Sequence, residues 1–448
     1  MTDASSAGPA LPVPQLFASD AHTRSRNAAE RRFRIYGLVA VGLSILALVV
    51  LLTSVIGTGA GAFRQAFIQI PVTLDAKIVD PKGHRDPEEM KKVTTIGYGK
   101  QLEASMLAAV AASGLDTTGM KPAEVSGLLS KEAASGLRDL VLARPQLVGQ
   151  TIEFRALANG RVDGYFKGRV SMESAALDSN ISPAQLRLAD EMRRTGLMTV
   201  AFNPDFLLGA DASEVRPEAA GLGVAILGSA YMMLIVLVLA LPIGVAASIY
   251  LEEFAPKNRW TDLIEVNIAN LAAVPSIVFG ILGLAIFINF MGLPQSAPIV
   301  GGLILTLMTL PTIIIATRVS LAAVPPSIRD AALGVGASRM QAVFHHVLPL
   351  ALPGILTGTI IGMARALGET APLLLIGMVA FVREFPGAPP EGFFQPASAL
   401  PVQVYNFTQR ADPAFVERAS GAIIVLLVFL ICMNAAAVIL RRRFERRW

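Results

Sequence analysis

Two charged residues, Arg365 and Glu369, stand within a long apolar stretch of this sequence. Their spacing of four would place both on one face of a helix, where they can pair. A charge inside a bilayer costs about 2.5 to 3.5 kcal/mol even on lenient scales, so such residues face a bundle interior or a pathway. The guanidinium fork of Arg365 suits an oxyanion such as phosphate or sulfate, and Glu369 would prevent too tight a grip. Alternatively, the pair locks this helix to its neighbours.

The composition places this pair in an integral membrane protein. The chain has 448 residues, of which 53% are hydrophobic and only 16% are charged, and its mean hydropathy is +0.56. A soluble protein is rarely so apolar. The single cysteine, Cys432, excludes a disulfide framework and a cysteine-rich metal site. We predict that this chain has no metal site and no catalytic residue. We also predict that it contacts membrane lipid and does not bind nucleic acid.

Six apolar stretches are long enough to cross a bilayer. Their predicted ranges are 35–56, 219–251, two spans within 266–317 that are broken near 289–298, 353–381 and 420–440. Basic tails flank the set at 1–34 and 441–448. Because arginines and lysines favour the cytoplasmic side, and six crossings return the chain to its starting side, both termini are predicted to be cytoplasmic.

Residues 57–218 have a different character, with acidic and basic residues nearly in balance and no stretch that could span a bilayer. We predict an extracytoplasmic α+β module there. Strict alternation of apolar residues from Ile68 to Ile78 predicts a half-buried strand, and Asn159-Gly160 predicts a hairpin turn. Helices are predicted at 86–112, at 121–142, and after the capping box at Ser182, ending near Gly196.

A polar stretch at 324–349 separates two apolar stretches and falls on the cytoplasmic side of the predicted topology. Proline and serine at helix-start positions predict two short helices, 326–333 and 338–347. Gly334 and Gly336 would permit the bend between them. Apolar side chains that could fill the groove of a partner are Ile328, Leu333, Met340, Val343 and Phe344. We interpret this stretch as a docking element.

The spacing within this stretch resembles the EAA loop of ABC importer permeases. That pattern is Glu-Ala-Ala, three residues, Gly, nine residues, Ile, one residue, and Leu-Pro. The matching residues here are Asp330, Ala331, Ala332, Gly336, Leu348 and Pro349. An aspartate replaces the usual glutamate at 330, and His346 replaces the usual isoleucine. The resemblance implies that these six residues couple the chain to an ATPase.

Three separated motifs resemble the phosphate-specific ABC importer permeases of the A type: 250–254, 272–280 and 365–374, in family order. The resemblance implies an all-α membrane fold, the six-span type I importer permease, with a core at 219–440 and the 57–218 α+β module inserted as a periplasmic domain. The module resembles the long form of the family. Arg365 and Glu369 carry over as residues of the substrate pathway.

The same resemblance implies an ATP-driven importer that brings inorganic phosphate across the bacterial inner membrane. Its implied partners are a C-type permease subunit, a dimer of ATPase subunits and a periplasmic phosphate-binding protein. The sequence contains no GxxxxGK[ST] phosphate loop, so this chain is predicted to bind no cofactor and to be no enzyme. ATP and Mg²⁺ would belong to the ATPase.

Two other classes of function stay open on the residues alone. One is a permease for another oxyanion, such as sulfate or molybdate, and the other is a membrane receptor that uses the outer module as its sensor. The docking element favours a permease over a receptor, and the 365–374 stretch favours phosphate less sharply. Arg318, at the end of a predicted span, either anchors a helix or lines the path.

Overall fold

The computed structural model describes residues 21–378 and 381–444, and divides into two compact units, Met1–Ser54 and Val55–Trp448. Most of helix α1 (Ala21–Gly59) makes up the described part of the first unit. It contains the predicted span 35–56, and its apolar side chains are exposed, as expected of a helix that meets lipid. The first twenty residues of the predicted basic tail lie outside the described residues.

The outer module begins directly after α1 and a short turn, η1 (Ala60–Phe63), and is built on an antiparallel sheet. Its strands are β1 (Arg64–Thr73), β2 (Thr151–Leu157) and β3 (Met198–Phe202), in the order β2-β1-β3. Ile70 pairs with Phe154 and Ile68 pairs with Met198. The alternating residues Ile68, Ile70 and Val72 are fully buried, so the predicted half-buried strand is confirmed as far as Thr73.

Helices complete the core of this module, with α4 against β1 and α6 against β2. The module's helices are α2 (Ala76–Val79), α3 (Pro87–Met90), α4 (Thr95–Ala112), α5 (Pro122–Ser126), α6 (Ala133–Ala143), η2 (Pro145–Leu147), α7 (Gly160–Phe166), α8 (Met172–Leu177) and α9 (Pro183–Thr195). The capping box at Ser182 and the stop at Gly196 are confirmed. Each of the two longer predicted helices is broken into two.

Two local predictions in the module are wrong. Asn159 does not form a hairpin turn: its side chain accepts a hydrogen bond from the backbone N–H of Arg161 and caps α7. Asparagine is common both at helix starts and in turns, and Asn159 lies at a helix start. Ile78 lies in α2 instead of the first strand, because Asp75 caps that short helix. The alternation of apolar residues therefore continues beyond the end of β1 at Thr73 and into α2.

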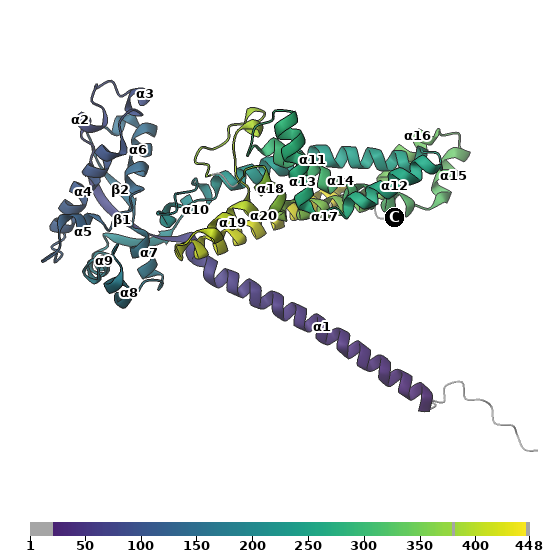
Figure 1. Cartoon of the computed structure of the whole chain (residues 1–448), viewed down its shortest axis with the longest axis horizontal. Helices are drawn as coiled ribbons and strands as arrows, with labels where there is room; N and C mark the ends of the chain where they lie inside the picture. The colour runs from purple at the N-terminus through teal and green to yellow at the C-terminus, as the bar shows by residue number, and fades with distance from the viewer. Residues whose placement is uncertain (1–20, 379–380, 445–448) are drawn as a thin grey trace, which may run out of the picture. The chain divides into compact units, whose positions relative to one another are not determined.

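The membrane core is a helix bundle in which α11, α14 and α17 pack together (Figure 1). Its long elements are α11 (Gly223–Ile249) with the π-helical turn η4 (Tyr250–Phe254), α12 (Arg259–Ala272), α13 (Ser276–Gly283) with η5 (Leu284–Phe290), α14 (Pro298–Ala322), α17 (Leu348–Gly368) and α20 (Ala414–Phe444). Small residues allow close approach: a Cβ at Gly358 would lie 2.2 Å from the Ala316 Cβ.

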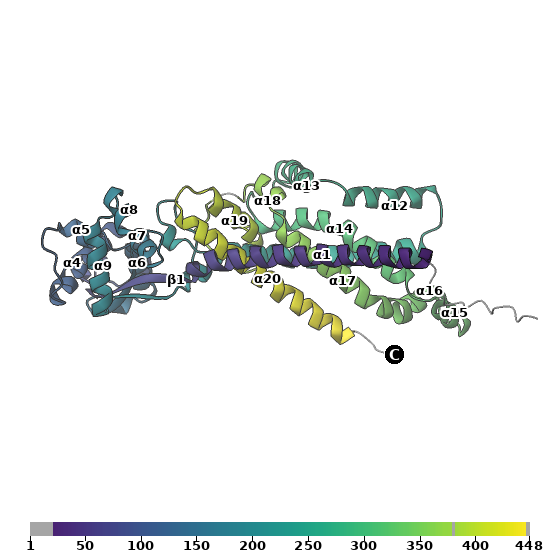
Figure 2. The ribbon, with the colours of Figure 1, turned by 90° about the horizontal axis from the view of Figure 1, so that it is seen from below.

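Among the described residues, five helices are long and apolar enough to cross a membrane, or six if the bent pair α12 and α13 counts as one span. The break between η5 and α14 falls at the predicted place. The bend of 100° between α12 and α13 was not predicted, although Pro275 marks it (Figure 2). Proline disfavours helical geometry in the residue before it, which accounts for the interruption.

Shorter elements connect these spans. Before α11 they are α10 (Asp205–Leu208) and η3 (Pro217–Ala219), and between α17 and α20 they are α18 (Ala371–Leu375), η7 (Glu391–Phe394) and α19 (Leu400–Gln409). Between α14 and α17 lie α15 (Pro326–Gly334), α16 (Arg339–Ala342) and η6 (Val343–Val347). The predicted fifth span, 353–381, is thus two helices, α17 and α18, and residues 379–380 lie outside the described part.

Candidate functional site

Arg365 and Glu369 are neighbours, but they do not share a helix as the sequence predicted. Arg365 lies in the last turn of α17, which ends at Gly368, and Glu369 adopts an extended conformation just beyond it. The Arg365 Nε and the Glu369 Oε1 are 3.7 Å apart, which is longer than a charge-assisted hydrogen bond. Within residues 21–378 and 381–444, the Arg365 guanidinium donates no hydrogen bond, so its fork is available to a ligand.

The two side chains differ in exposure. That of Arg365 is 48% exposed, whereas that of Glu369 is 19% exposed. On the protein side, Ala366 and Leu367 belong to a buried apolar cluster that also contains Phe279 of α13. A Cβ at Gly280 would lie 2.7 Å from the Pro372 Cα, so α13 holds α18 closely. The residues beside Arg365 are therefore tightly packed, while about half of the Arg365 side chain is exposed.

Arg365 also lies toward one end of its helix. It is seventeen residues beyond Leu348, where α17 follows the 324–349 stretch, which corresponds to about 25 Å along the helix axis. This position is nearer the C-terminal end of α17 than its middle.

The docking element 324–349 contains the two short helices expected of it. Gly336, between α15 and α16, has a φ of +92°, a conformation that side chains with a Cβ rarely adopt. Gly334 ends α15 without a positive φ, so only one of the two predicted glycines is required by the bend. Asp330 and Ala331 are exposed and Ala332 is buried, while Leu348 and Pro349 begin α17.

The predicted apolar side chains of this element divide into two groups. Leu333, Met340 and Phe344 are exposed, as a docking role requires. Val343 is 3% exposed and belongs to an apolar cluster of the bundle, so the prediction that it faces a partner is wrong. Ile328 is partly buried against the same cluster. The most exposed apolar residue of the element, Val335 at 86%, was not singled out from the sequence.

Met340 and Phe344 also border an apolar cavity of about 730 Å³. Its other walls come from the end of α11, including Leu241 and Ile249, and from α17, including Ile355. One face of the docking element therefore borders this cavity, and another packs against buried side chains.

Two arginines hold this end of the bundle, and the sequence did not reveal their partners. Arg329 of α15 donates to the Glu253 carboxylate at 2.6 Å and to the carbonyls of Val324 and Leu321 at 2.8 and 2.9 Å. Its pairing with Glu253 joins α15 to the end of α11. The signal that could have found it is the 250–254 motif, whose two glutamates are its only charges.

Arg318 near the end of α14 is paired in a similar way. Its Nε lies 3.2 Å from the Glu252 Oε2, and its Nη2 lies 2.8 Å from the Glu265 Oε1 of α12. With two carboxylate partners on two other helices, Arg318 connects helices and has less freedom than Arg365 to bind an anion. This geometry favours the anchoring interpretation of Arg318.

These features define a membrane-embedded permease with a docking element at one end and a weakly held arginine toward the other. A model of the family described as "binding-protein-dependent transport system inner membrane component" matches residues 240–448. A second model, described as "domain of unknown function (DUF3333)", matches residues 20–176. Residues 240–448 therefore carry a domain of the binding-protein-dependent family, and the chain has the fold of a type I ABC importer permease.

Similar proteins of known family show which type of permease this chain is. It is 34% identical over 230 residues to the probable ABC transporter permease protein YqgI of Bacillus subtilis, covering 49% of this chain and 78% of that one. It is 31% identical over 236 residues to the phosphate transport system permease protein PstA 1 of Mycobacterium tuberculosis, covering 52% and 75%. Within its family, this is a PstA-type permease.

Solved structures are also similar to about half of this chain, and we give one example. It is an inward-facing conformation of the MetNI methionine ABC transporter, with a TM-score of 0.39 and 16% identity, covering 50% of this chain and 97% of that one.

Proposed function

We propose that this chain is the permease subunit of an ATP-driven importer that moves inorganic phosphate into the cytoplasm. The observation that carries the proposal is the half-exposed guanidinium of Arg365, backed by packed helices and touched only weakly by Glu369. The similarity to phosphate transport permeases supports phosphate as the anion. A planar fork recognises two oxygens of a phosphate, and the nearby carboxylate keeps that grip weak enough for release.

The remaining subunits follow from the family of the chain. An ABC importer permease works with an ATPase and with a binding protein, and we propose specifically a C-type permease partner, a dimer of ATPase subunits and a periplasmic phosphate-binding protein. The six residues Asp330, Ala331, Ala332, Gly336, Leu348 and Pro349 would couple this chain to the ATPase, which would bind ATP and Mg²⁺. This chain would bind no cofactor itself and catalyse no reaction.

Uptake of radiolabelled phosphate tests the function. Cells that lack this chain are expected to lose uptake at low external phosphate, and cells that regain it are expected to recover uptake. Sulfate and molybdate are measured in parallel. Restored uptake of either of these anions with no restored phosphate uptake would assign the permease to another oxyanion, and no restored uptake of any of the three would refute a role in oxyanion transport.

The proposed location is the inner membrane, with both termini in the cytoplasm and the 57–218 module in the periplasm. Single cysteines at Ser5, which lies outside the described residues, and at the exposed Glu173 of α8 test this after Cys432→Ala. In intact cells a membrane-impermeant thiol reagent is expected to label position 173 and to leave position 5 unlabelled until the cells are opened. The reverse pattern would invert the topology.

The pairing of Arg329 with Glu253 gives a further prediction. Glu253→Gln keeps the shape of the side chain but removes its charge, and a charged hydrogen bond contributes about 1.5 to 3 kcal/mol. We expect α15 to be held less firmly, with less ATPase co-purified and about a tenfold fall in uptake. Glu252→Gln is the matched control, because Arg318 keeps Glu265. Equal effects of both changes would contradict a specific role for Glu253.

A further inference from the structure

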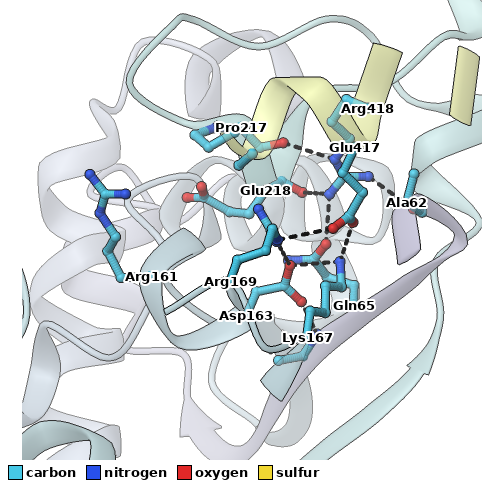
Figure 3. A network of polar contacts seen from close by, with 12 residues as sticks. Ala62, Gln65, Arg161, Asp163, Lys167, Arg169, Pro217, Glu218, Glu417 and Arg418 are labelled. Atoms are coloured by element: carbon cyan, nitrogen blue, oxygen red, sulfur yellow. Dashed lines mark hydrogen bonds and ion pairs between the residues drawn. The ribbon is translucent and has the colours of Figure 1, made fainter. Parts of the chain in front are cut away.

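A network of charged side chains joins the outer module to the outer end of α20 (Figure 3). Glu417 of α20 lies between two cations of the module: its Oε1 is 2.8 Å from the Lys167 Nζ, and its Oε2 is 3.0 Å from the Arg169 Nε. Asp163 of α7 contacts the same two cations, at 2.7 and 3.1 Å. The four side chains form a closed ring of alternating charge, of which only Glu417 belongs to the membrane core.

The next residue of α20, Arg418, extends this network to both junctions between module and membrane. Its guanidinium donates to the Ala62 carbonyl at 3.0 Å and to the Gln65 Oε1 at 2.6 Å, where the chain enters the module. It also donates to the carbonyls of Pro217 and Glu218 at 3.1 and 3.0 Å, where the chain leaves. We call the five residues Asp163, Lys167, Arg169, Glu417 and Arg418 the collar network.

Burial makes these contacts hard to exchange for water. The side chains of Asp163, Glu417 and Lys167 are 3, 7 and 10% exposed, and Arg418 as a residue is 2% exposed. A buried charge that loses its partner is strongly unfavourable, so the module cannot separate from α20 without a large penalty. Glu218 lies beside the network: burial raises the pKa of its carboxyl, which accepts a hydrogen bond from the Ser130 hydroxyl at 2.6 Å.

Further ionic contacts join the module to the later part of the chain, beyond Glu369. The Arg383 Nη2 lies 2.8 Å from the Glu132 Oε1 of the module. Near the end of the module, Asp211 accepts two hydrogen bonds from Arg410 at the end of α19, at 3.1 and 2.5 Å. Because Arg383 and Arg410 both lie between the candidate path residue Glu369 and α20, this region is connected to the module at two points.

We propose that the outer module and the outer end of α20 move as one body, and that the collar network is the connection through which the module controls the outer opening of the path. The module is then a moving part of the transport machinery. A force on its surface reaches α19, α20 and the segment after Glu369 without passing through a flexible linker. The mechanical connection does not depend on which anion the permease carries.

Spin labels test the rigid connection in the assembled transporter. With Cys432→Ala as background, labels are placed at the exposed positions Glu173 of the module and Val416 of α20. The distance distribution between them is expected to stay the same, within about 2 Å, in the resting state and with ATP trapped. A second pair, Glu173 with the exposed Ala323 at the end of α14, shows whether the bundle has moved. A shift of the first pair that equals that of the second would overturn the proposal.

Variants test the control of transport. Glu417→Gln opens the ring, and Arg418→Met removes the four hydrogen bonds to the junctions. Either variant, compared at equal membrane insertion, is expected to broaden the distance distribution of the first pair and to lower uptake at least about fivefold, the usual lower range of coupling between sites. Arg161→Met is the matched control, because Arg161 is more exposed and reaches Asp412 of the membrane core only at 3.6 Å. It is expected to change neither reading.

Chemical cross-linking separates a lost connection from general damage. In Lys167→Cys/Glu417→Cys, on the Cys432→Ala background, a short bis-methanethiosulfonate reagent forms a disulfide with each cysteine and releases two sulfinates, so that a reducible covalent bridge replaces the ion pair between the same two positions. Uptake is expected to be low before cross-linking, to recover after it, and to fall again after reduction. Wild-type uptake in the unbridged double variant, together with a broadened distribution in Glu417→Gln, would refute control by the module. Loss of all uptake with no recovery after cross-linking would also refute control by the module, because a covalent link between the two positions would then fail to replace the ion pair.

Discussion

Arg365→Gln is expected to abolish phosphate uptake while the protein still inserts in the membrane. The structure leaves the side chain of Arg365 half exposed and places its Nε 3.7 Å from the Glu369 Oε1. Two charged hydrogen bonds to an anion, at about 1.5 to 3 kcal/mol each, predict at least a hundredfold fall in uptake. Radiolabelled phosphate uptake, normalised to inserted protein, measures it.

The stability of the same variant separates the two interpretations of the pair. An ion pair this long and this exposed contributes about 0 to 1 kcal/mol, so thermal unfolding should change little if Arg365 serves the path. If the pair instead locks α17 to its neighbours, Arg365→Gln should lower the unfolding temperature and retain uptake in the fraction that folds. Wild-type uptake in this variant would exclude the pathway role.

Two conservative changes refine the role. Arg365→Lys keeps the charge but loses the fork, so partial uptake with poorer discrimination among oxyanions is expected. Glu369→Gln removes the competitor for the guanidinium, and is expected to preserve phosphate binding while slowing release. Binding and uptake measured on the same membranes distinguish these effects. A Glu369→Gln variant that loses binding would show that the carboxylate positions the arginine instead of competing with the anion.

The sequence predicted features that depend on local pattern. Most of the predicted spans coincide with long helices, because length and hydropathy largely decide whether a segment can cross a bilayer. The strand through Ile68 to Val72 and the capping box at Ser182 were equally visible, since each uses a fixed spacing. Arg365 stood out because a charge in an apolar stretch is rare.

What the sequence did not predict depends on competing signals or on distant residues. The helix containing Arg365 ends at Gly368, so Glu369 lies outside it. Gly368 and Pro372 are helix stop signals that compete with the four-residue spacing of the charges, and in the structure the stop signals prevail. The contact of Arg329 with Glu253 crosses 76 positions. The collar network joins four separate segments, and no pattern within one of them indicates the others.

The second large effect is expected at Gly336. Its φ of +92° is strained for any residue with a Cβ and most of all for a β-branched one, with a cost of about 1 to 2 kcal/mol or more. Gly336→Val should therefore distort the connection between α15 and α16, where Gly336→Asn, which tolerates this conformation, should be milder. Gly336→Asp adds a charge that is costly to bury against the ATPase.

Gly334→Ala is the matched control. A Cβ at either glycine would meet no atom within 4 Å, so crowding is the same for both and only the backbone conformation differs. Because Arg329 holds α15 to Glu253, the strain at 336 cannot be relieved by moving α15 and must displace α16, with its exposed Met340. We expect Gly336→Val to lower ATPase co-purification and uptake about tenfold, and Gly334→Ala to change neither. Undiminished co-purification and uptake in Gly336→Val would show that the ATPase does not depend on this bend.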